Sequence, residues 1–113
     1  MNTKGRQGED LAASYLKRKG FTILARNYCS RLGEIDLVCR DRATIVFVEV
    51  KSKASADYSE PYQSVTARKR AKLRRLAELY LVTHRQENAD ARFDVLGITL
   101  GSKPQFEHLV GAF

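Results

Sequence analysis

The sequence has few of the residues that build disulfide scaffolds and zinc sites. Only two of its 113 residues are cysteines and two are histidines. If the segments around Cys29 and Cys39 form a tight hairpin, the two cysteines lie out of register and cannot bond. We therefore expect reduced thiols, as in the cytosol. His84 and His108 are far apart and have no matching cysteine spacing, which argues against a zinc site.

Long apolar runs are also missing. A membrane-spanning helix needs about 18 or more apolar residues in a row, and no such run occurs, so we expect no membrane span. The polar, glycine-containing start does not resemble a signal peptide. There is no glycine-rich phosphate loop, internal repeat or low-complexity segment. With 43% hydrophobic residues, the sequence predicts a single globular domain over residues 1–113 and a cytoplasmic location.

Residues 34–51 form the most distinctive stretch, with two apolar β-strands joined by a short polar turn. The second strand, around residues 45–48, is apolar enough to be buried on both faces. It nevertheless carries Glu49 and Lys51, which share one side because side chains alternate along a strand. Asp36 interrupts the first strand in the same way. A carboxylate in an apolar strand is costly unless it is compensated, so the two acids predict a bound divalent cation such as Mg²⁺.

The hydrophobic periodicity predicts further elements on either side of this stretch. They are an amphipathic helix over 4–19, a strand over 21–28, a helix over 65–84, and strands over 92–100 and 105–110. The resulting order predicts an α/β fold with a central mixed sheet flanked by helices. Asp94 interrupts the penultimate strand, and we interpret it as a salt-bridge partner for a strand arginine rather than as a metal ligand.

The first predicted helix has Thr3 as a candidate N-cap and Gly20 as a candidate C-terminal cap. On a helical wheel Glu9 falls beside the apolar face, whereas Asp10 points away from it. Glu9 therefore either looks inward near the helix start or is an N-terminal acid that favours the helix dipole. The spacing alone leaves both interpretations open.

Much of the net charge of +7 is concentrated in the second predicted helix, where six of the eight residues over 68–75 are basic and none is acidic. Such a cluster attracts a phosphate backbone. A solvated helix face is an alternative, and so is an anionic membrane surface, although the apolar face of this helix is needed for the core. The candidate nucleic-acid-binding residues are Arg68, Lys69, Arg70, Lys72, Arg74, Arg75 and, after the apolar strand, Lys53.

Lys69 differs from its basic neighbours because it is aligned with the apolar stripe of its helix. It is expected to point toward the sheet, either to the rim of the carboxylate site or along the apolar stripe with its head reaching water. The loop over 52–64 leaves directly from Lys51 and should border the same site. It is either a flap over a bound ligand or an ordinary surface loop.

The combination of Asp36, Glu49 and Lys51 matches the needs of phosphodiester hydrolysis. A metal ion must neutralise the scissile phosphate and lower the pKa of a bound water. Mg²⁺ binds through one or two carboxylates and retains several waters, so two acids are enough. A nearby lysine can hold the attacking water or stabilise the developing negative charge.

Several motifs resemble those of the bacterial YraN-like family. They are Gly5-Arg6-x-Gly8-Glu9, Asn27-Tyr28, Gly33-Glu34-Ile35-Asp36-Leu37, Val46-Phe47-Val48-Glu49-Val50-Lys51 and Arg92-Phe93-Asp94-Val95. The resemblance covers nearly the whole chain. That family looks like a minimal member of the PD-(D/E)xK nuclease superfamily, related to archaeal Holliday-junction resolvases. The resemblance implies a restriction-endonuclease-like core of αβββαβ order.

The resemblance also implies roles for individual residues. Asp36 and Glu49 would be metal ligands, the backbone carbonyl of Val50 would add a third, and Lys51 would be catalytic. Glu9 occupies the position of a first-helix glutamate that joins the site in the resolvase relatives. The sequence departs from the superfamily at the residue before Asp36, which is isoleucine instead of proline.

Three functions follow as hypotheses. The first is an endonuclease dependent on Mg²⁺ or Mn²⁺ that acts on structured or branched DNA. The second is a nucleic-acid-binding module that keeps the fold without cutting. The third is an interaction protein whose basic helix meets an acidic partner. Junction cleavage needs two symmetric cuts, so a homodimer would suit the first hypothesis.

Overall fold

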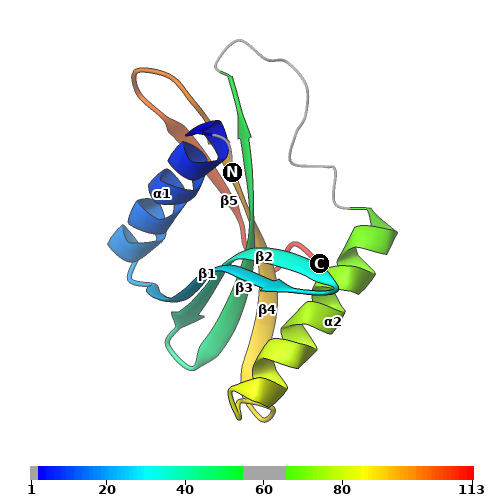
Figure 1. Cartoon of the computed structure of the whole chain (residues 1–113). Helices are drawn as coiled ribbons and strands as arrows, with labels where there is room; N and C mark the ends of the chain where they lie inside the picture. The colour runs from blue at the N-terminus through cyan, green and yellow to red at the C-terminus, as the bar shows by residue number, and fades with distance from the viewer. Residues whose placement is uncertain (1–2, 55–65) are drawn as a thin grey trace.

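The computed structural model describes residues 3–54 and 66–113, which form two helices and five strands (Figure 1). The elements are α1 (Thr3–Arg18), β1 (Thr22–Ser30), β2 (Gly33–Asp41), β3 (Thr44–Lys53), α2 (Ala67–Thr83), β4 (Asp90–Thr99) and β5 (Gln105–Leu109). Strand β3 extends to Lys53, so the start of the expected loop over 52–64 is strand. Residues 55–65, which hold most of that loop, lie outside the described residues.

The strands form one sheet in the order β1-β2-β3-β4-β5. Strands β1, β2 and β3 are an antiparallel meander, β4 is parallel to β3, and β5 is antiparallel to β4. Helix α2 lies between β3 and β4 in the chain, as a parallel connection requires. The predicted α/β fold, with its αβββαβ order and mixed central sheet, is confirmed.

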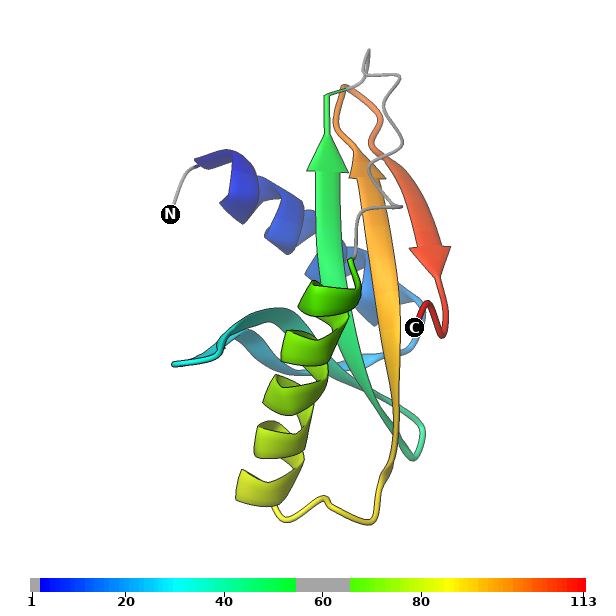
Figure 2. The same ribbon diagram turned by 90° about the vertical axis from the view of Figure 1, so that its right-hand side faces the viewer.

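The two helices cover opposite faces of the sheet (Figures 1 and 2). Strand β3 shows why both are needed, because its apolar side chains alternate between the faces. Val46 and Val48 belong to the core cluster under α1, whereas Ile45 and Phe47 belong to the cluster under α2. All four are at most 2% exposed, so the third strand is buried on both faces, as predicted.

Backbone caps set the ends of the helices. After α1, Gly20 has φ +96° and its N–H donates to the Lys17 carbonyl, while the Phe21 N–H donates to the Leu16 carbonyl. This is the Schellman motif, and it confirms Gly20 as the C-terminal cap. Helix α2 starts slightly later than predicted because Thr66 is its N-cap, with its side-chain oxygen accepting the Lys69 N–H.

Strand β4 carries the fully buried acid Asp94. Its carboxylate accepts hydrogen bonds from Arg92 Nε at 3.0 Å, from the Gly111 N–H at 2.9 Å and from His108 Nε2 at 2.8 Å. The predicted salt bridge to a strand arginine is therefore confirmed. Both cysteines are free thiols, as expected. Over residues 3–54 and 66–113, neither helix has the length and apolar character needed to cross a bilayer.

Candidate active site

Asp36 and Glu49 meet where β2 and β3 separate. The β2–β3 ladder runs from Asp41 paired with Thr44 to Leu37 paired with Val48, and Asp36 is the next residue along β2. Instead of continuing the ladder, the Asp36 side chain accepts a hydrogen bond from the Val50 N–H at 2.7 Å. The carboxylate thus occupies the gap between the diverging strands and satisfies a backbone donor there.

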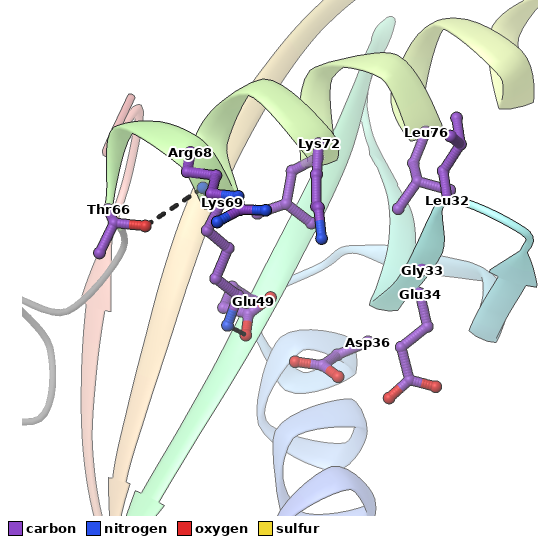
Figure 3. A pocket seen from close by; sticks show the side chains of 11 residues that line it. Leu32, Gly33, Glu34, Asp36, Glu49, Thr66, Arg68, Lys69, Lys72 and Leu76 are labelled. Atoms are coloured by element: carbon purple, nitrogen blue, oxygen red, sulfur yellow. Dashed lines mark hydrogen bonds and ion pairs between the residues drawn. The ribbon is translucent and has the colours of Figure 1, made fainter.

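Both acids line a cavity of about 420 Å³ between α2 and the β1–β2 hairpin (Figure 3). Its described lining residues are Leu32, Gly33, Glu34, Asp36, Glu49, Thr66, Arg68, Lys69, Lys72, Leu73 and Leu76. Glu49 is 9% exposed and Asp36 is half-buried. The hairpin and β3 supply the carboxylates, and α2 supplies the cations that face them.

Two lysines surround Glu49. Lys69, in the first turn of α2, places Nζ 2.8 Å from Glu49 Oε1, and Lys51 places Nζ 3.7 Å from the same oxygen. The Thr66 cap fixes the helix start that aims Lys69 at the sheet. Of the two interpretations of Lys69, the geometry supports the one in which it reaches the rim of the carboxylate site.

The charges of this cluster shift one another's proton affinity. Burial, and then the negative charge of Glu49, raise the pKa of Asp36 to about 7, although the Val50 N–H opposes the change. Burial and the neighbouring Lys69 ammonium lower the pKa of Lys51. Burial also disfavours charge on Lys69, but its hydrogen bond and attraction to Glu49 prevail and raise its pKa. Asp36 is therefore short of compensating positive charge, whereas Glu49 is in ion-pair contact with Lys69.

The donors at this point suit a hard divalent cation. The N–H and C=O of one strand residue point to the same side, so the Val50 carbonyl lies on the side on which its N–H meets Asp36. Asp36, Glu49 and the Val50 carbonyl would present only oxygen ligands, which Mg²⁺ and Mn²⁺ prefer. The unfavourable ionisation of Asp36 is also what a nearby cation would relieve. The residues present therefore fit a bound metal ion.

Glu9 is buried, but its hydrogen-bond partners are not among the residues that line the cavity. Its Oε1 accepts hydrogen bonds from Arg26 Nε at 2.9 Å and from Asn27 Nδ2 at 3.2 Å, both on β1. Glu9 thus looks inward, as one of its two interpretations held. Within the described part of the chain, no three His, Cys, Asp or Glu side chains form a group that could hold a metal. A metal-binding role for Glu9 stays a prediction.

The basic cluster of α2 divides by helical position. Arg68, Lys69 and Lys72 line the cavity. Arg70 and Arg74 instead lie over the ring of Phe113, with their guanidinium carbons 5.7 and 6.0 Å from its centroid. Arg75 is exposed, and Lys53 ends β3. Three of the seven predicted nucleic-acid-binding residues therefore share the cavity with the acids.

The cavity also contains residues that the sequence reasoning missed. Glu34 precedes Asp36 by two positions in β2, so strand alternation would have placed both on one side. No sequence pattern of this kind placed Leu32 or Thr66 near the acids. One lies in the β1–β2 turn and the other caps α2, and they meet at the cavity only in the folded chain.

Comparison with known proteins gives a consistent family match. The model of the uncharacterised protein family UPF0102 matches residues 8–98, which include Asp36, Glu49, Lys51 and Lys69. A UPF0102 protein of Geobacter metallireducens is 48% identical over 110 residues, covering 96% of this chain and 90% of the relative. Those of Pelotomaculum thermopropionicum and Syntrophomonas wolfei are each 43% identical, over 112 and 110 residues. They cover 96% of this chain, and 93% and 96% of the relatives.

Proposed function

The chain belongs to the family UPF0102, and from the geometry of its acidic cavity we propose that it is a metal-dependent endonuclease of the PD-(D/E)xK type. It would hydrolyse phosphodiester bonds in structured or branched DNA. The observation that carries the proposal is the meeting of Asp36 and Glu49 in one cavity, with Lys51 and Lys69 beside Glu49. This is the set of groups that metal-assisted phosphodiester hydrolysis requires.

Asp36, Glu49 and the Val50 carbonyl would hold the cation, Mg²⁺ or Mn²⁺. When bound, the ion supplies Lewis-acid chemistry by neutralising the scissile phosphate and lowering the pKa of a water. Lys51 would orient that water or stabilise the charge developing on the phosphate oxygens. The water oxygen forms the new bond to phosphorus while the bond to the leaving ester oxygen breaks. One water proton ends on the leaving oxygen and the other passes to solvent.

The cations of α2 would hold the DNA backbone. Arg68 and Lys72 line the cavity beside the acids, so they would contact phosphates next to the scissile one. Lys53 and the remaining cations of the helix would add longer-range attraction. A cytoplasmic location is part of the proposal, since both cysteines are free and the substrate is cellular DNA. So is a homodimer, which would allow paired cuts at a junction.

A non-catalytic nucleic-acid-binding module is the second candidate function. One observation favours it, because Lys69 already forms a 2.8 Å ion pair with Glu49. That pair neutralises the glutamate without a metal. In this case the acids would serve to place the lysines of a binding surface, and the fold would bind DNA without cutting it.

A cleavage assay separates the two functions. The purified protein is incubated with single-stranded, duplex, flap and four-way-junction DNA in Mg²⁺, Mn²⁺ or EDTA. A nuclease gives divalent-dependent products, which Asp36→Asn and Glu49→Gln each reduce by about 10³-fold or more, while DNA affinity changes only a few-fold. Glu34→Gln is the matched control, since Glu34 is an exposed carboxylate of the same cavity and should retain most activity.

The opposite outcome is equally definite. If no DNA is cut with either metal, and charge reversal over 68–75 abolishes binding, the module is the correct function. A steep fall of DNA affinity with salt would argue against a role limited to an acidic protein partner.

A further inference from the structure

The cavity has a polar end and an apolar end. Asp36 and Glu49 lie at one end, while Leu32 and Leu76 lie together at another (Figure 3). Leu73 adds a further apolar wall from α2. An ion site alone would need only the carboxylate end. The apolar end is therefore suited to a part of the substrate that has no charge.

The exposed part of the apolar end is Leu32, because Leu73 and Leu76 are 5% and 1% exposed and belong to the core cluster under α2. Leu32 is 41% exposed at the tip of the β1–β2 hairpin, where its N–H donates to Ser30 Oγ at 3.0 Å. The next residue, Gly33, has φ +133°, and a Cβ there would lie 3.7 Å from Leu76 Cδ1. The hairpin backbone thus passes close over α2 and holds Leu32 at the cavity mouth.

Helix α2 contributes three cations to the cavity. Lys69 lies at the acidic end, where it pairs with Glu49, Arg68 lies beside it, and Lys72 lies between that end and Leu76 (Figure 3). A row of cations that leads from an acidic site toward an apolar side chain matches the layout of a nucleotide, whose phosphate is charged and whose base has an apolar face. The volume of about 420 Å³ lies in the range of pockets that enclose a small ligand. A base that stays stacked in a duplex cannot enter such a pocket.

We infer that the cavity binds one unstacked nucleotide beside the scissile phosphate, with its base against Leu32 at the apolar end. The substrate class is therefore DNA whose nucleotides are unpaired at the cut, as in a flap, a junction point or a single strand. Continuous duplex is a poor substrate. This inference rests on the proposed function and adds to it the state of the DNA at the cleavage point.

The test begins with the wild-type protein on a flap and on a continuous duplex of the same sequence, with Mn²⁺. The flap should be cut at least about tenfold faster, because a paired base must first be extruded from the stack. The variant Leu32→Ser should then lose about tenfold in cleavage of the flap, because it removes the apolar surface that the base would contact. Equal rates on flap and duplex would overturn the inference.

Leu79→Ser is the matched control. Leu79 is also a partly exposed leucine, at 38%, and it lies on α2 outside the cavity lining. Leu79→Ser should cut the flap at the wild-type rate. If both variants lose activity alike, or neither does, Leu32 has no particular role and the inference fails.

A second readout does not depend on cleavage. In the flap substrate, 2-aminopurine replaces the base on each side of the branch point in turn, and binding is followed with Ca²⁺ in place of Mn²⁺. Unstacking relieves the quenching of 2-aminopurine, so its fluorescence should rise severalfold at one of the two positions with wild type, and less with Leu32→Ser. No rise at either position would overturn the inference.

The two proposals fail differently. If no DNA is cut with any divalent ion, the nuclease proposal fails, and the binding readout decides the nucleotide pocket by itself. If the protein cuts duplex and flap at the same rate, and Leu32→Ser changes nothing, the nuclease stands and the nucleotide pocket is wrong.

Discussion

Two places in this sheet bury acidic side chains, and they handle the charge in opposite ways. Asp94, in β4, is fully buried and receives hydrogen bonds from Arg92, His108 and the Gly111 N–H. Burial would raise the pKa of Asp94, but these donors outweigh it and lower the pKa. Burial, and then the nearby Glu49 carboxylate, raise the pKa of Asp36 to about 7, and the hydrogen bond from the Val50 N–H only partly opposes this.

The difference separates an acid that the protein itself compensates from an acid whose charge is left partly uncompensated. Asp94 is more buried than Asp36, yet it is compensated by the protein itself and needs nothing further. Asp36 stays short of positive charge where the sheet opens into a cavity, although Glu49 beside it is paired with Lys69. Burial of a carboxylate is therefore a weak sign of function, and the balance of charge around it is a stronger one.

The largest expected effect is on stability. Asp94→Asn should lower the free energy of unfolding by about 3 kcal/mol, because it removes the fully buried carboxylate that accepts hydrogen bonds from Arg92, His108 and the Gly111 N–H. Asp36→Asn should cause no loss at pH 8 in EDTA, since it removes an unfavourable charge. Urea denaturation of the two variants measures the contrast. Equal losses would show that both acids are structural and would remove the basis of the comparison.

The next effect concerns pH. The pKa of Asp36 in the folded protein is raised from 3.8 to about 7, so its ionisation disfavours folding. The penalty is absent below about pH 4, grows as pH rises to about 7, and is constant above that. An asparagine side chain cannot ionise, so the stability of Asp36→Asn relative to wild type should increase by about 2 kcal/mol between pH 5 and pH 8 in EDTA.

The control for this pH effect is Glu87→Gln. Glu87 is exposed on the connection after α2, so its difference from wild type should stay constant between pH 5 and pH 8. A flat difference for Asp36→Asn as well would mean that Asp36 is compensated in the folded protein, as Asp94 is.

A smaller effect is expected for metal affinity. The Lys69 ammonium forms an ion pair with Glu49, so a metal ion that binds this carboxylate has to compete with the ammonium. Lys69→Met should therefore raise the affinity for Mn²⁺ about tenfold without DNA, since it removes a nearby like charge. Calorimetry with Mn²⁺ measures the change. Lys72→Met, one turn along the same cavity wall, should change the affinity at most about twofold. A fall in affinity for Lys69→Met would show that Lys69 supports the metal site.

The smallest effect is expected at Glu9. Its carboxylate is engaged by Arg26 and Asn27, so Glu9→Gln should change Mn²⁺ affinity less than about twofold. Glu49→Gln should abolish measurable binding in the same titration. A loss of about tenfold or more for Glu9→Gln would place Glu9 in the metal site, as the resemblance to the resolvases implies.

Much of the architecture was predictable from local pattern. The apolar run of β3, the cap at Gly20 and the stripe of α2 are each encoded in neighbouring residues, so periodicity and cap rules were enough to predict them. Asp36 and Glu49 could be singled out because each interrupts an apolar strand. The Glu9 interactions could not be predicted, since its partners lie in β1 and helical spacing says nothing about what a face will meet.

The sequence by itself determined the order of the elements, the doubly buried third strand and the identity of the acids, because these follow from alternation and hydrophobicity along the chain. Only the tertiary structure decided which charges meet. Strands β2 and β3 separate at Asp36, Lys69 contacts Glu49, and the β1–β2 hairpin passes close to Leu76. Each of these arrangements depends on residues that are distant in the chain. Coulombic and apolar contacts depend on distances in space, so the compensation of Asp94 and the poorly compensated charge of Asp36 emerge only when the sheet has formed.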